Sequence, residues 1–258
     1  MKISVIMQSF LGDYPGSRRL PKEKFIRAVN SFLYQTHKDK ELVIVSDGCE
    51  ITKKLYELYF SDSEQIKFCY IHRNIEKEKS MYSEEDGIVT YRGVPREVGR
   101  AIATGDLVTY FDTDDIMLPN RLSDLDDFWK DVSDDIMWSS NSVRIINEKA
   151  LNSDLYLESK ARIGDRIFEI SNMETKEKEK FFINLAVPDN MVSTASYSIC
   201  HRREVKTRWK NVTRHKDDLS TPSEDHLFLR EMQNNESAGL KQKSASIVIC
   251  HYRGIWDV

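Results

Sequence analysis

Four short apolar runs in the first half of the chain lack polar alternation and are rich in Val, Ile, Phe and Tyr. Runs of this kind are typical of strands that are buried on both faces of a parallel sheet. The four predicted strands are Ile3–Met7, Leu42–Val45, Ile66–Ile71 and Leu107–Phe111. Parallel strands need crossover segments between them, so the intervening residues should be helical.

Segments with helical periodicity do separate these runs. The first begins after Pro21, a favourable first-turn residue, and its apolar residues recur at three- and four-residue spacing up to Leu33. The second repeats this pattern over Ile51–Tyr59, and the third opens at Pro95 and ends before Gly105. One face of the third helix carries its apolar positions, Val94, Val98 and Ile102. The order β-α-β-α-β-α-β predicts a doubly wound α/β fold.

Two long loops and a less regular second half complete the predicted organisation. The loops Gln8–Leu20 and Arg73–Gly93 follow the first and third strands, and long loops at the carboxyl ends of parallel strands commonly bind ligands. The charge-rich stretch Met173–Lys180 is predicted to be a solvated helix. Strand candidates of the second half are Ile136–Ile146, Ala195–His201 and Ile247–His251. We therefore expect a single unit in which a doubly wound, mostly parallel sheet continues into a smaller, mixed C-terminal region.

Composition excludes several classes of function. A length of 258 residues with 40% hydrophobic residues suits one globular domain with a filled core. The formal charge of −4 creates no field that would recruit nucleic acid, so no nucleic-acid partner is expected. No segment approaches the roughly 20 apolar residues of a membrane span, which favours a cytoplasmic protein. The cysteines form no CxxC pair and are expected to be reduced: Cys49, Cys69, Cys200 and Cys250.

An acidic cluster follows directly on the fourth predicted strand: Asp112-Thr113-Asp114-Asp115. Three carboxylates at one edge of a sheet repel one another unless a cation compensates them. Mg²⁺ and Mn²⁺ prefer oxygen ligands and keep coordination positions open for phosphates, so Asp112 and Asp114 are predicted to share one metal bound to a diphosphate. A helix N-cap is the alternative, because Asp115 precedes Ile116 and acidic residues are common at helix starts.

The segment Phe111–Leu122 resembles the signature of family 2 glycosyltransferases, in which an apolar strand ends in D-x-D-D and is followed by a proline and an apolar residue. Further segments resemble family motifs in the same order along the chain: Ser4–Met7, Ser31 to Gln35, Glu41–Gly48, Ala101–Asp106 and Ser223–Arg230. The chain departs from the family pattern at Ser46, Cys49 and Pro95-Arg96-Glu97. The resemblance implies a GT-A fold.

It also implies a metal-dependent enzyme that moves a sugar from a nucleotide-sugar to a hydroxyl acceptor with inversion. Uridine diphosphate (UDP) is the family's commonest nucleotide, and the acceptor would be a glycan, a lipid-linked compound or another hydroxyl compound. Residues 1–122 would bind the nucleotide-sugar, and residues 123–258 would bind the acceptor and complete the catalytic site. The metal, Mn²⁺ or Mg²⁺, would take a further ligand from His251, with His201 as its rival.

The resemblance assigns roles to two carboxylates late in the chain. Asp225 would be the general base that takes the proton of the acceptor hydroxyl, and Glu224 would orient the acceptor. On the residues alone, both carboxylates also suit the first turn of a helix capped by Ser223, where the helix dipole favours negative charge.

The resemblance also assigns residues to the nucleotide. Asp47 would accept a hydrogen bond from the nucleobase, although Asp-Gly turns are common on their own. The other candidates for donor binding are Gln8 and Ser9, which leave the first strand with Phe10, and Asp112, Arg92 and Arg96 at the diphosphate. For each arginine a solvated surface position is the alternative.

Two other enzyme classes and one binding function remain as alternatives. A nucleotidyltransferase acting on a sugar phosphate would share the sheet and the metal, but Gly12–Arg19 lacks the closely spaced glycines of its phosphate loop. A metal phosphatase usually has its D-x-D at the end of the first strand, where this chain has Gln8 and Ser9. A non-catalytic nucleotide-sugar-binding protein would be expected to lose the carboxylates that are present here.

Overall fold

The computed structural model describes residues 1–12, 20–72, 88–90, 93–146, 160–163, 166–169, 198–214, 224–236 and 239–250. In this part of the chain the main sheet has eight strands: β1 (Ile3–Ser9), β2 (Lys40–Asp47), β3 (Ile66–Ile71), β5 (Leu107–Tyr110), β6 (Ile116–Met117), β7 (Trp138–Ile146), β10 (Ile199–Arg202) and β12 (Gly239–Cys250). The described helices are α1 (Pro21–Leu33), α2 (Glu50–Tyr59), α4 (Gly93–Ile102), α5 (Arg121–Lys130) and α7 (Glu224–Asn235). None of these helices is long and apolar enough to cross a membrane.

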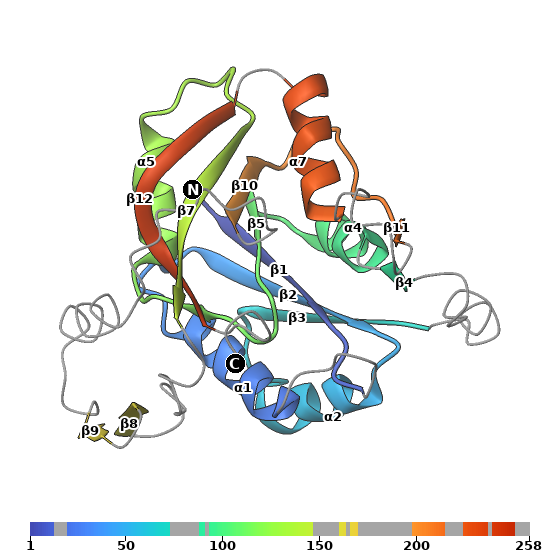
Figure 1. The fold of residues 1–258 in the computed structure, drawn as a ribbon, viewed down its shortest axis with the longest axis vertical. Helices are drawn as coiled ribbons and strands as arrows, with labels where there is room; N and C mark the ends of the chain where they lie inside the picture. The colour runs from blue at the N-terminus through green and yellow to red at the C-terminus, as the bar shows by residue number, and fades with distance from the viewer. Residues whose placement is uncertain are drawn as a thin grey trace.

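The spatial order of the strands is β3-β2-β1-β5-β10-β7-β12-β6 (Figure 1). The four strands predicted in the first half form a parallel block, because β1 pairs in parallel with β2 and β5, and β2 pairs in parallel with β3. The second half makes the sheet mixed. There β10 is antiparallel to both β5 and β7, while β12 is parallel to β7 and antiparallel to β6. The predicted α/β fold with a mostly parallel first half is therefore confirmed.

The second half differs from prediction in detail. The strand predicted at the C-terminus begins at Gly239 rather than at Ile247. The predicted loop Arg73–Gly93 contains a short strand, β4 (Ile88–Thr90), which pairs with β11 (Val212–Arg214) in a small antiparallel sheet. A second small sheet consists of β8 (Lys160–Ile163) and β9 (Arg166–Glu169). The helix predicted at residues 173–180 lies outside the described residues.

Two apolar cores lie on opposite faces of the parallel block. One joins alternate residues of β1 to α1 and α5 through Met7, Phe25 and Leu122. The other joins the intervening β1 residue Ile6 to β5 and α7 through Tyr110 and Phe228. Figure 1 shows α1 and α2 on one side of these strands and α4 and α7 on the other. Strands that are buried on both faces are uniformly apolar, which is why the runs in the sequence lacked alternation.

Helix α4 buries a different face from the one its apolar residues define. Val94 is 47% exposed, whereas Arg96 and Arg100 are buried together with Gly93 and Gly99. A buried guanidinium is tolerated only when it is paired and hydrogen-bonded. The tertiary contacts of these arginines, rather than the apolar periodicity, therefore orient α4.

The first residue of the family-like segment Glu41–Gly48 is a structural anchor at the start of β2. Glu41 is buried and accepts hydrogen bonds from the Ser4 hydroxyl at 2.6 Å and from the Thr104 N–H at 2.6 Å. The ammonium groups of Lys2 and Lys67 each lie 2.9 Å from it. Burial by itself would raise the pKa of the Glu41 carboxyl, but these bonds and cations together lower that pKa far below its usual range.

We expect Glu41→Gln to reduce the free energy of unfolding by about 2 kcal/mol at pH 7, because several donors lose a charged acceptor. The pKa of Glu41 is lower in the folded than in the unfolded chain, so the wild-type advantage should be complete above about pH 4.3 and shrink as the pH falls below it. Urea unfolding of both proteins at pH 7 and at pH 3.5 measures this. Equal stability at pH 7 would contradict the anchoring role.

Candidate active site

The site lies where the strand order reverses. Strand β1 has β2 on one side and β5 on the other, so the crossovers from β1 run in opposite directions. Ligands of open α/β sheets bind at such a switch point, beyond the carboxyl ends of the strands. Here these ends carry Gln8 and Ser9 of β1, Asp47 of β2 and Asp112 after β5. The structure therefore brings four of the predicted site residues to one edge of the sheet.

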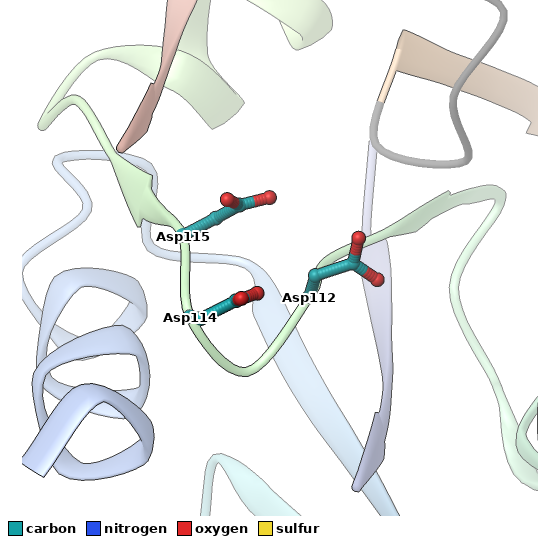
Figure 2. A group of neighbouring side chains, drawn as sticks. All are labelled: Asp112, Asp114 and Asp115. Atoms are coloured by element: carbon teal, nitrogen blue, oxygen red, sulfur yellow. The ribbon is translucent and has the colours of Figure 1, made fainter. Parts of the chain in front are cut away.

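The loop between β5 and β6 carries three neighbouring carboxylates (Figure 2). Ligand oxygens of Asp112, Asp114 and Asp115 all lie within 4.8 Å of one another. Asp115 is 2% exposed, while Asp112 and Asp114 are half-buried. Strand β6, not a helix, follows Asp115, so the helix-cap interpretation of this cluster is wrong. Helix α5 begins only at Arg121.

The cluster is suited to a divalent metal. Clustered hard oxygen ligands that remain partly open to solvent are what Mg²⁺ and Mn²⁺ require when they also bind phosphate oxygens. The set differs from the prediction by including Asp115, which the sequence offered as a cap, whereas the predicted ligand His251 lies outside the described residues. The carboxylates do not by themselves choose between the two ions.

His201, the rival metal ligand, is a core residue instead. It is fully buried, one ring nitrogen lies 2.8 Å from the Tyr110 hydroxyl, and the other lies 2.7 Å from the Arg202 carbonyl oxygen. Burial, together with the nearby Arg100 guanidinium, lowers the pKa of His201 to about 3. Both ring nitrogens therefore have partners inside the core, and neither has the metal-binding role that the sequence allowed.

Helix α1 holds the acidic loop in place. The buried Arg27 donates from Nη2 to the Asp114 carbonyl oxygen at 3.0 Å. The Ser31 hydroxyl accepts from the Met117 N–H at 3.1 Å, and the Gln35 amide donates to the Leu118 carbonyl oxygen at 2.7 Å. The family-like segment from Ser31 to Gln35 therefore has a structural function, since it fixes the backbone just after the carboxylates. Arg27 was not predicted; its one sequence signal is a charge next to apolar Phe25, Ala28 and Val29.

A buried arginine joins the acidic loop to the candidate base. Arg96 of α4 is 2% exposed, and its Nη1 lies 2.8 Å from Asp225 Oδ1 and 3.7 Å from Glu224 Oε1. Its Nη2 lies 3.9 Å from Asp112 Oδ1. Helix α7 begins at Glu224, so both carboxylates do occupy a first helical turn. The solvated-surface interpretation of Arg96 is therefore wrong, whereas its predicted contact with a diphosphate stays a prediction.

An aromatic side chain fixes the guanidinium of Arg96 from one face. The Arg96 guanidinium lies 4.2 Å from the ring centre of Trp209, which stacks on Phe228 at 4.0 Å. The backbone N–H of Trp209 donates to Glu97 Oε1 at 2.7 Å. Trp209 lies in an irregular segment between β10 and β11 that carries no motif, so nothing in the sequence pointed to it.

The loop after β2 is closed by the residues that depart from the family pattern. The Ser46 hydroxyl donates to the Cys49 carbonyl oxygen at 2.9 Å, and Gly48 has a positive φ of 66° that favours glycine. Asp47 is half-buried beside this turn. Ser46 thus closes the turn with its own side chain. Despite the departures from the family pattern at Ser46 and Cys49, Asp47 still lies at the carboxyl end of β2.

The remaining predicted donor residues differ in how they are placed. Ser9 is buried and its hydroxyl pairs with the Thr52 hydroxyl at 2.8 Å, so its side chain serves the packing of α2. The side-chain oxygen of Gln8 is buried and has no hydrogen-bond partner among the described residues. Arg92 lies outside the described residues. The nucleotide roles of all three stay predictions.

Comparison with known proteins supports the assignment of the fold. No family model matches the chain. An uncharacterized glycosyltransferase of Nostoc sp. is 34% identical over 122 residues, which are 47% of this chain and 31% of that protein. The crystal structure of S. aureus TarS 1–349 in complex with UDP superposes with a TM-score of 0.58 at 16% identity, covering 97% of this chain and 61% of that one. The complex of TarS 1–349 with UDP-GlcNAc gives a TM-score of 0.58 at 17% identity, covering 98% and 60%.

The resemblance to glycosyltransferases is therefore confirmed, and the chain has a GT-A-type α/β fold. It spans less than two thirds of the length of the proteins that it matches. The division into a donor half and an acceptor half stays a prediction.

Proposed function

We propose that this chain is a metal-dependent glycosyltransferase that moves a sugar from a UDP-sugar to a hydroxyl acceptor with inversion. One observation carries the proposal. Asp112 of the acidic cluster and the candidate base Asp225 both lie beside the buried guanidinium of Arg96, at 3.9 Å and 2.8 Å from its nitrogens. A transferase needs these two features close together, because its leaving group and its acceptor meet at the same carbon.

In this reaction the acceptor oxygen forms a bond to the anomeric carbon of the sugar. The bond between that carbon and the diphosphate oxygen breaks, and the nucleoside diphosphate departs with the electron pair. Asp225 takes the proton of the acceptor hydroxyl, while Glu224 orients the acceptor. Asp112, Asp114 and Asp115 would hold Mn²⁺ or Mg²⁺, which when bound neutralises the charge that develops on the diphosphate.

The donor is proposed from the neighbouring structures and from the switch point. TarS has been solved with UDP and with UDP-GlcNAc, and Asp47 occupies the end of β2, where a carboxylate suits the imide N–H of uracil. Gln8, near the end of β1, and Arg92 are proposed as further donor contacts. A cytoplasmic location is proposed on the sequence alone.

UDP is expected to stabilise the protein only together with a divalent metal. Without the cation, the carboxylates and the diphosphate face each other as like charges. At about 100 times its Kd, UDP with Mn²⁺ should raise the Tm by about 5–10 °C, whereas UDP with a chelator should leave it unchanged. Thermal unfolding with UDP and with GDP, each with Mn²⁺ or chelator, measures both the metal dependence and the base preference.

The same protein is then incubated with a panel of donors: UDP-GlcNAc, UDP-glucose, UDP-galactose and GDP-mannose, each with Mn²⁺. Slow hydrolysis of one of them, with release of the nucleoside diphosphate, is the expected result. An equal UDP effect with chelator and with Mn²⁺, or release of pyrophosphate from UTP and a sugar phosphate, would contradict the proposal. The second of these outcomes would indicate a nucleotidyltransferase.

A further inference from the structure

The contacts of Arg96 carry an inference that rests on the proposed function and goes beyond it. We infer that Arg96 is a positioning residue for Asp225: it sets the place of the base relative to the metal site rather than binding the donor. The resemblance had placed this arginine at the diphosphate. The two roles predict different effects on kcat and on UDP affinity, so kinetic measurements distinguish them.

The distances favour Asp225 as the principal partner. Nη1 of Arg96 lies 2.8 Å from Asp225 Oδ1 and 3.7 Å from Glu224 Oε1, and Nη2 lies 3.9 Å from Asp112 Oδ1. At 2.8 Å the ion pair is in direct contact, whereas at 3.9 Å it is at the limit of one. The ionised form of Asp225 is the one that forms this pair, and it is also the form that acts as a base.

Arg96 itself has little freedom to move toward a ligand. Its side chain is 2% exposed, and the Trp209 ring covers its guanidinium at 4.2 Å. Trp209 is in turn held by the stacked ring of Phe228 and by Glu97, which lies on the same helix as Arg96. A guanidinium held in one orientation is better suited to fixing the position of Asp225 than to binding a mobile phosphate.

The guanidinium also spans the two halves of the site. Its Nη2 faces Asp112 at the end of β5, and its Nη1 faces Asp225 at the start of α7. These residues are more than 100 positions apart in the sequence, and Arg96 on α4 contacts both. The separation between the metal carboxylates and the base therefore depends on Arg96, and a misplacement of about 1 Å can reduce a rate about 100-fold.

The test compares Arg96→Met, which keeps the stem and removes the charge, with Arg96→Lys, which keeps the charge without the fork. Arg100→Met is the matched control, since Arg100 lies one turn later, is also buried, and donates to the carbonyl oxygens of Val205 and Thr207. Hydrolysis of the fastest donor in the panel is measured against donor concentration with Mn²⁺, and the affinity for UDP with Mn²⁺ is measured by calorimetry. All rates are taken well below the lowest Tm.

We expect Arg96→Met to lower kcat by about 10- to 100-fold while KM and the UDP affinity stay within about twofold of wild type. Arg96→Lys should recover part of that loss, and Arg100→Met should keep wild-type kcat at reduced stability.

A weakened UDP affinity at unchanged kcat would make Arg96 a donor ligand and overturn the inference while leaving the function intact. Equal losses in Arg96→Met and Arg100→Met, or no loss in either, would also overturn it. If Arg96→Met does not fold, the split between kcat and KM in Arg96→Lys decides. Wild-type protein that neither binds UDP nor hydrolyses any donor would remove the proposed function and this inference together.

Discussion

Asp114→Asn is expected to abolish transfer while leaving the fold intact. The substitution keeps the shape of the side chain but removes one negative charge from a cluster whose ligand oxygens lie within 4.8 Å of one another. A bound metal supplies several kcal/mol of charge stabilisation in the transition state, so its loss should lower the rate by about 10³-fold. The metal-dependent gain in Tm with UDP should disappear with it. Donor hydrolysis and thermal unfolding of the variant measure the two effects.

The metal-free variant should be as stable as wild type or more stable by up to about 1 kcal/mol, because repulsion among the three carboxylates is relieved. Asp106→Asn is the matched control: Asp106 precedes the other end of β5 and accepts a hydrogen bond from the Lys2 N–H at 2.8 Å. This control should retain full activity. Wild-type turnover in Asp114→Asn would show that the cluster holds no catalytic metal.

The second large effect is expected for Asp225→Asn, which should lower kcat by about 10²–10⁴-fold through loss of the general base. UDP and Mn²⁺ should bind as before, because Asp225 is separated from Asp112 by the Arg96 guanidinium. Single-turnover rates and calorimetric UDP affinities measure these two quantities. Product stereochemistry, determined on the wild type by NMR of the fresh product, tests inversion separately.

Because Asp225 pairs with Arg96, a stability measurement alone does not distinguish a general base from a first-turn helix carboxylate. A first-turn carboxylate alone would contribute about 0.3–1 kcal/mol. Asp225→Asn also removes the nearest carboxylate of a buried guanidinium, so a larger loss is expected whether or not Asp225 is the base. The rate is therefore the decisive measurement. Asp124→Asn, in the first turn of α5, is the matched control and should lose a little stability and no activity. Full activity in Asp225→Asn would place the base elsewhere.

The sequence by itself determined the parallel half of the fold and the place of its acidic cluster. Strands buried on both faces are continuous apolar runs, so β1, β2 and β5 were predicted to within two residues at each end. The half-buried edge strand β3 is also a continuous apolar run and was predicted with its observed bounds. The acidic run sits at a strand end by sequence alone, and the parallel topology then places it beside the end of β1. Such features depend on residues that are neighbours in the chain.

Tertiary structure decided which side chains meet. Arg96 and Arg100 are buried on α4 against the apolar periodicity of that helix, because Arg96 pairs with Asp225, and Arg100 pairs with Glu97 and donates to carbonyl oxygens of residues 205 and 207. Arg27 reaches the Asp114 carbonyl from α1, and Asp115 joins the acidic cluster instead of capping a helix, since β6 pairs with β12. The burial of a charge is favourable only if a partner lies within a few ångströms. Because these partners are up to about 130 residues away in the chain, only the folded arrangement of α1, α4 and α7 around the sheet could reveal them.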